Sequence, residues 1–199
     1  MSERPTKSTK SQMKDNLRVV DGRLQGTATM NRLEAYDATA LVGLRTRVMN
    51  VAVEHIDEQG ERTVELPKLR ELLVTAAVSR CLMPIRLRGS EVKMMRRLMK
   101  MTLADLAGRL DERTAPETVS RWESEAQPMG GYAEKLIRLI VCDELCKEAP
   151  GVEYSASKIA HLRVMDPWRV DTNYEVPFIE LKYVPMKMEH AAIIDTWAA

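Results

Sequence analysis

The chain has 199 residues, of which 45% are hydrophobic and 30% are charged, and its formal net charge is +1. This length fits one large domain or two small ones, and the near-neutral charge excludes a protein that coats nucleic acid through overall positive charge. Its three cysteines form no CxxC pair, which argues against a disulfide-stapled secreted protein. No run approaches the roughly 18 apolar residues of a membrane span, and the first residues lack the apolar stretch of a signal peptide. We therefore expect a cytoplasmic protein without membrane contact.

Residues 1–24 are polar and carry six basic against three acidic side chains. Such a stretch cannot bury enough apolar surface to fold by itself, so we expect a flexible basic tail. Two interpretations remain open for it. It is either a solvated tail or a basic arm that contacts DNA phosphates.

Residues 25–84 are expected to form an N-terminal α+β domain. Alternating apolar positions over residues 45–56 predict one strand. Turn residues follow at 57–60, and residues 61–66 predict the returning strand of a hairpin.

A helix is predicted to follow this hairpin. Pro67 suits the first helical turn, and apolar residues at i, i+3 and i+4 spacing extend the helix to about Arg80. Pro84 ends that pattern and begins a linker. The second domain, which is helical, is expected over residues 85–148.

The second domain opens with two predicted helices. Ser90 is a good N-cap for the first of them. Thr102 can cap the second, which covers residues 103–110, with Asp105 in its first turn. The small side chain of Ala107 would allow a neighbouring helix to cross closely.

A third short helix is predicted over residues 116–123. Pro116 suits its first position, and Val119 and Trp122, three residues apart, are expected to face inward. The opposite face then consists of short polar side chains and one arginine, a composition that can enter the major groove and read base edges. The side chains expected on this face are those of Glu117, Thr118, Ser120 and Arg121.

These side chains have distinct predicted roles. Arg121 would donate to guanine O6 and N7 or to a phosphate, and Glu117 could accept from cytosine N4. Thr118 and Ser120 are short enough to let the backbone approach the DNA. Positioning contacts to phosphates are expected from cations around the helix. The candidates are Arg96, Arg97, Lys100, Arg109 and Arg113.

The predicted DNA-binding site contains seven residues. It comprises the four side chains of the exposed face together with Thr102, Arg113 and Pro116 at its borders. No catalytic residue, metal ligand or cofactor is predicted.

The segments LADLAGRL (103–110) and APETVSRWE (115–123) resemble the helix-turn-helix of the Xre/Cro repressor family. The following QPMGGYAEKLIRLI resembles a segment of the MqsA-type (YgiT-like) antitoxin regulators. The resemblance covers about residues 85–145, roughly a third of the chain. It implies a helical DNA-binding domain whose recognition helix is the third predicted helix. Leu103 stands where the family often has Gln, and Asp111 replaces the customary Gly.

A second resemblance lies in VEHIDEQG, residues 53–60, which is similar to a CxxC segment in the zinc-binding half of MqsA-type proteins. Ile56 and Gln59 stand where that family has its thiolates. His55 alone cannot supply the four ligands of tetrahedral zinc. The resemblance therefore implies a degenerate N-terminal domain that keeps the hairpin-plus-helix shape without the metal.

Residues 149–199 form a predicted C-terminal extension with a strand at 176–184. An isolated strand is unstable, so it should pair with the N-terminal sheet or with a second subunit. The expected fold class is α+β. It combines an N-terminal β-hairpin and helix, a central all-α helix-turn-helix bundle of the Xre type, and a C-terminal β-strand tail.

The expected function is that of a homodimeric, sequence-specific transcriptional regulator of double-stranded DNA, because helix-turn-helix proteins read two half-sites related by a two-fold axis. Apolar residues of 131–145 could form part of the dimer interface. Two alternatives remain open. One is an antitoxin that neutralises a toxin, or binds another protein, through its N-terminal domain and autoregulates its operon, and the other is an architectural or excision factor of a mobile element. An enzyme is not expected, because the histidines lack partner spacing and no Gly-rich phosphate loop is present.

Overall fold

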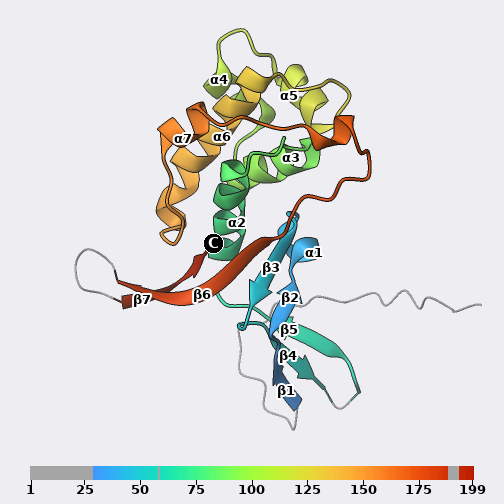
Figure 1. The fold of residues 1–199 in the computed structure, drawn as a ribbon, viewed down its shortest axis with the longest axis vertical. Coiled ribbons are helices and arrows are strands. Elements are labelled where there is room, and N and C mark those ends of the chain that lie inside the picture. The colour runs from blue at the N-terminus through green and yellow to red at the C-terminus, as the bar shows by residue number, and fades with distance from the viewer. Residues whose placement is uncertain (1–28, 58, 188–192) are drawn as a thin grey trace, which may run out of the picture.

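The computed structural model describes residues 29–57, 59–187 and 193–199. This part of the chain is mixed α+β, with seven α-helices and two sheets, which confirms the predicted class at that level. Most of the helices gather at one end, the smaller sheet projects at the other, and the larger sheet lies between them (Figure 1). The predicted basic tail, residues 1–24, lies outside the described residues.

Most of the helical residues belong to one group of packed helices, in which α2 contacts α3, α6 and α7 and α4 contacts α5 and α6. The core of this group is apolar and continues into the larger sheet. The helices are α1 (Thr39–Val42), α2 (Leu69–Leu82), α3 (Gly89–Leu98), α4 (Leu103–Leu110), α5 (Pro116–Glu123), α6 (Gly131–Leu145) and α7 (Ala156–Ala160).

The smaller sheet contains three antiparallel strands in the order β1 (Thr29–Arg32), β4 (Val53–Ile56) and β5 (Arg62–Glu65). The hairpin β4–β5 confirms the predicted hairpin. Asp57 organises its turn, since its carboxylate accepts from the amides of Gln59 and Glu61 at 2.9 and 2.8 Å.

The single strand predicted over residues 45–56 is wrong. The chain forms β3 (Thr46–Met49), which joins the larger sheet, and then β4, which joins the smaller one. Asn50 separates the two strands with a left-handed backbone (φ 55°), a conformation that asparagine tolerates better than most residues. The apolar alternation continues across Asn50, so the sequence pattern does not indicate that the chain passes from one sheet to the other.

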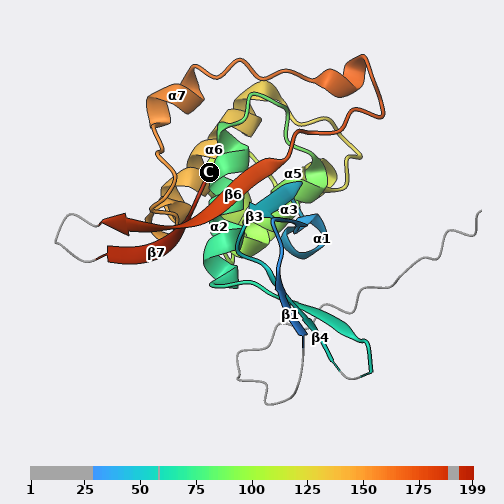
Figure 2. The same ribbon diagram turned by 60° about the horizontal axis from the view of Figure 1, so that its bottom comes forward.

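The larger sheet has the order β2 (Ala35–Asp37), β3, β6 (Ile179–Lys187) and β7 (Ile193–Ala198). The strand predicted at 176–184 thus exists as β6 and pairs in parallel with β3, the N-terminal partner that was one of the two expected. Both views place β6 beside β3 (Figures 1 and 2).

The strand β7 is anchored on α2 by the fully buried Trp197. The backbone N–H of Trp197 donates to the Glu71 carboxylate at 3.0 Å, and its indole N–H donates to the carbonyl of Pro67 at 3.2 Å. The ring also packs against that of Tyr183, with centroids 5.3 Å apart. This end of the described chain is therefore part of the core.

Two predicted helix starts are displaced. Pro67 does not begin α2, because Lys68 takes a left-handed conformation and the helix starts at Leu69. Likewise Ser90 is not the N-cap of α3. That position belongs to Arg88, whose backbone N–H donates to the Glu91 carboxylate at 2.7 Å.

A buried charge network joins α2, α3 and α6 to residues 81–87. The guanidinium of Arg80 binds the Glu91 carboxylate at 2.7 and 2.9 Å. Arg138, which is fully buried, binds Glu134 at 2.8 Å. The arginines also bind four main-chain carbonyls, those of Cys81, Met83, Ile85 and Arg86.

The division into domains at residues 84 and 148 stays a prediction, and two contacts cross these boundaries. Helix α2 packs on α6, and β6 pairs with β3. None of the helices in the described ranges is long and apolar enough to cross a membrane.

Candidate nucleic-acid interface

The helices α4 and α5 pack against each other and are joined by a short turn. Their bounds are those expected from the sequence. On α4 the side chain of Ala107 is 2% exposed, so a small residue lies where the helices approach, as predicted. On α5 the inward-facing residues are Val119 and Trp122, which confirms that prediction.

The start of α4 is fixed by a reciprocal cap. The Thr102 hydroxyl oxygen accepts from the backbone N–H of Asp105 at 3.1 Å, and the Asp105 carboxylate accepts from the backbone N–H of Thr102 at 2.8 Å. The hydroxyl of Thr102 also donates to that carboxylate, which lowers the pKa of Asp105 below its ordinary value. Thr102 therefore acts as the N-cap predicted from the sequence.

The substitution Thr102→Ala should lower the free energy of unfolding by about 1 kcal/mol, because the backbone N–H of Asp105 in the first turn of α4 loses its acceptor. Thr102→Ser, which keeps the hydroxyl, serves as the control. Because the pKa of Asp105 is lowered, stabilisation by this pair is present above the ordinary carboxyl pKa and is lost as the pH falls. Urea denaturation at neutral and acidic pH tests both statements, and equal losses in the two variants would contradict the cap.

The turn between the helices is organised by Asp111. Its carboxylate accepts from the amides of Arg113 at 2.6 Å and Thr114 at 2.8 Å. These hydrogen bonds, first that from Arg113, lower the pKa of Asp111. The backbone of Asp111 is extended (φ −168°), so this turn does not need a glycine there.

The outer face of α5 carries most of the predicted reading residues. Glu117, Ser120 and Arg121 are exposed, whereas Thr118 is half-buried although the sequence predicted it on the same face. Pro116 occupies the first helical position, as expected, after Ala115, which has no side-chain cap. The face is therefore short, polar and narrower than the sequence indicated.

The end of α5 is held against the start of α3. A Cβ on Gly89 would lie 2.3 Å from the carbonyl oxygen of Trp122 and 2.6 Å from that of Glu123, so only glycine fits this approach. About two turns further along α3, Arg96 binds the Glu123 carboxylate at 2.6 and 2.9 Å, which raises the pKa of Arg96. Sequence reasoning missed both contacts, although a glycine at a helix start is a signal for close packing.

Of the five cations predicted to contact phosphates, two form ion pairs within the chain and three are exposed. Arg96 is 11% exposed and bound to Glu123, so it positions α5 instead of facing solvent as expected. Arg109 forms an exposed ion pair with Glu144 at 2.6 Å. The remaining three are exposed on the helical unit: Arg97, Lys100 and Arg113.

Helix α6 offers less free apolar surface than the sequence suggested. Ile137, Ile140 and Leu145 are buried within the chain, where α6 packs on α2. Leu136 and Leu139 are half-buried against the same core. The proposed contribution of residues 131–145 to a dimer interface is reduced accordingly.

His55 lies in the smaller sheet and binds the Glu65 carboxylate through Nε2 at 3.0 Å. It is buried, and its Nδ1 has no partner among the residues that the structure describes. The same ranges contain no group of three His, Cys, Asp or Glu side chains that could hold a metal ion. His55 thus links β4 to β5.

Comparisons of the chain with protein-family models, with curated proteins and with solved structures find no match. The resemblance to Xre-type regulators therefore stays a prediction from the motifs of α4 and α5, and that to MqsA-type regulators stays a prediction from residues 127–140 and 53–60.

Proposed function

We propose that the protein is a sequence-specific regulator that binds double-stranded DNA as a homodimer, with α5 in the major groove. The observation that carries this proposal is the two-sided character of α5. Val119 and Trp122 fix the helix to the core, while Glu117, Ser120 and Arg121 point to solvent. A rigidly held helix with short polar side chains and one arginine suits the readout of base edges.

The residues around α5 divide into reading and positioning groups. Arg121 is the strongest candidate for a base contact, since a guanidinium binds guanine O6 and N7 with two hydrogen bonds. Glu117 suits the amino group of cytosine. Arg113 in the turn would contact a phosphate, which orients the protein without reading sequence. Thr102 holds the start of α4 instead, because its backbone N–H and its hydroxyl both donate to Asp105.

The homodimer follows from the size of the reading face. One eight-residue helix contacts only a few base pairs, so regulators of this class bind two half-sites about one helical turn apart. A two-fold dimer provides two copies of α5 in matching orientation.

Arg121→Ala should sharply reduce the preference for specific sites and leave weak, salt-dependent binding. Loss of a bidentate base contact weakens specific binding by about tenfold or more, because such a contact contributes about 1–3 kcal/mol of discrimination. Selection of bound fragments from a genomic library identifies the sites, and titration at several salt concentrations measures the affinities.

The matched control is Arg62→Ala, which removes an exposed arginine from β5 in the smaller sheet. It should leave the specific affinity unchanged. Full specific binding by Arg121→Ala would overturn the assignment of α5. Strong DNA bending without effect on transcription would favour an architectural or excision factor.

One observation favours a second candidate function, that of an antitoxin. The smaller sheet projects from the helices (Figure 1), and its edge strands β1 and β5 pair with no further strand in the described ranges. Such edges can accept a strand from a protein partner. If this function holds, the protein should suppress toxicity of a co-expressed neighbouring gene, and Arg121→Ala should keep that suppression.

A further inference from the structure

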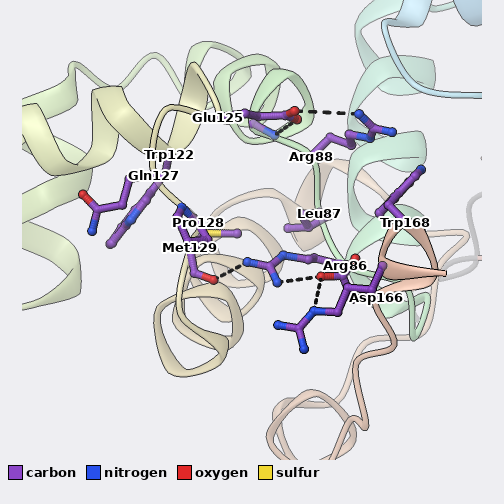
Figure 3. A pocket seen from close by; sticks show the side chains of 12 residues that line it. Arg86, Leu87, Arg88, Trp122, Glu125, Gln127, Pro128, Met129, Asp166 and Trp168 are labelled. Atoms are coloured by element: carbon purple, nitrogen blue, oxygen red, sulfur yellow. Dashed lines mark hydrogen bonds and ion pairs between the residues drawn. The ribbon is translucent and has the colours of Figure 1, made fainter. Parts of the chain in front are cut away.

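A cavity of about 330 Å³ lies where the start of α3, the end of α5 and the 3₁₀ helix η2 (Pro167–Arg169) meet (Figure 3). This volume falls within the range of small-molecule sites. Leu87 and Met129, which are both buried, form the apolar part of the cavity wall. The cavity is thus distinct from the exposed face of α5, yet it borders the same helix.

The side chains around the cavity carry an excess of positive charge, with three guanidinium groups against two carboxylates. Asp166 is shared by Arg86 at 2.8 Å and Arg169 at 3.3 Å. Glu125 lies 3.7 Å from a nitrogen of Arg88, which is longer than a hydrogen bond. Figure 3 shows these contacts as dashed lines. Arg88 and Arg169 therefore retain N–H groups for an incoming anion.

Two tryptophans contribute to the same cavity. The guanidinium of Arg88 lies 4.4 Å above the ring centre of Trp168, which holds the cation in a fixed orientation. Trp122 is 9% exposed, and its indole N–H finds no acceptor within the part of the chain that the structure describes. Buried donors without partners are rare in folded proteins and indicate a place for a further polar group.

We propose that this cavity binds a small aromatic carboxylate, and that binding changes the DNA affinity of α5. The carboxylate binds the guanidinium of Arg88, and the ring packs on Leu87 and Met129. Trp122 follows the reading residue Arg121 in α5 and forms part of the wall, so an occupant displaces or stiffens that helix. The regulatory step rests on the proposed DNA-binding function, whereas binding to the cavity does not.

The chain offers a direct test because its three tryptophans give three indole N–H signals in a ¹⁵N spectrum. Titration of the full chain with 2-naphthoate at neutral pH should shift the signals of Trp122 and Trp168 saturably. The signal of Trp197 should stay in place, because that residue is buried against α2 and reports the integrity of the fold. Absence of shifts at Trp122 and Trp168 overturns the site.

Two controls test the role of charge. 2-Naphthamide has the same ring without the negative charge. Its affinity should be lower than that of 2-naphthoate by about tenfold or more, since charge-assisted hydrogen bonds are lost. Arg88→Gln should weaken 2-naphthoate binding by a similar factor, whereas Arg62→Gln on β5 should not. Equal binding of the acid and the amide, or unchanged binding by Arg88→Gln, overturns the proposal.

The DNA measurement separates this proposal from the proposed function. Saturating 2-naphthoate should change the affinity of the wild type for its specific site by about fivefold or more, a typical coupling between two sites. Specific DNA binding without any naphthoate binding overturns the cavity and supports the function. Naphthoate binding without specific DNA binding supports the cavity and overturns the function. Binding of both with unchanged affinity overturns the coupling.

Discussion

Arg138→Met is expected to lower the free energy of unfolding by about 3–5 kcal/mol, the usual cost of removing one partner from a buried ion pair. The side chain is fully buried and binds Glu134 together with the carbonyls of Cys81, Met83 and Ile85. Methionine fills much of the space but satisfies none of these acceptors. The Glu134 carboxylate would then remain buried without its cation.

The matched control is Arg109→Met, which removes an arginine from an exposed pair with Glu144. Surface pairs contribute at most about 1 kcal/mol, so this variant should remain close to the wild type. Urea denaturation of both proteins gives the comparison. If the two variants lose similar stability, the buried network is not a principal support of the fold. A double-mutant cycle with Glu134→Leu should show coupling, because the second substitution costs less once Arg138 is gone.

Trp197→Ala should lower the free energy of unfolding by about 3–5 kcal/mol, since a fully buried aromatic side chain leaves a large cavity. The substitution also removes the hydrogen bond to Pro67 and the ring contact with Tyr183. Trp197→Phe keeps most of the ring and should cost much less. Denaturation followed by circular dichroism, which does not depend on the removed fluorophore, gives the values.

Tyr132→Ala is the control for this prediction, because Tyr132 is 76% exposed on α6. A surface substitution of this kind changes stability by about 0.5 kcal/mol or less. A loss below about 1 kcal/mol for Trp197→Ala would contradict the role of β7 as part of the core.

The helices α4 and α5 could be predicted from sequence because their signals are local. Thr102 and Asp105 are three residues apart, Pro116 fixes the first turn of α5, and Val119 and Trp122 repeat at helical spacing. Each of these signals is contained within one or two helical turns. The bounds of both helices therefore required no knowledge of the rest of the fold.

Features that depend on distant partners could not be predicted in the same way. The ion pair of Arg96 has no local signal, because its partner Glu123 lies 27 residues further along the chain. The break at Asn50 was missed because β3 and β4 find their partners in different sheets. For the same reason the cavity, whose walls come from three separate segments, has no signature in the sequence.

The parallel pairing of β3 with β6 has a consequence for the order of folding. Thr46 in β3 pairs with Ile179 in β6, so the larger sheet closes only after the intervening helices have been synthesised. Contacts of such long sequence separation form slowly. Until then β3 exposes an unpaired edge, and the nascent chain is vulnerable to aggregation at that strand. Because Ile179, Leu181 and Trp197 belong to the same core as the helices, that core is complete only when β6 and β7 have joined it.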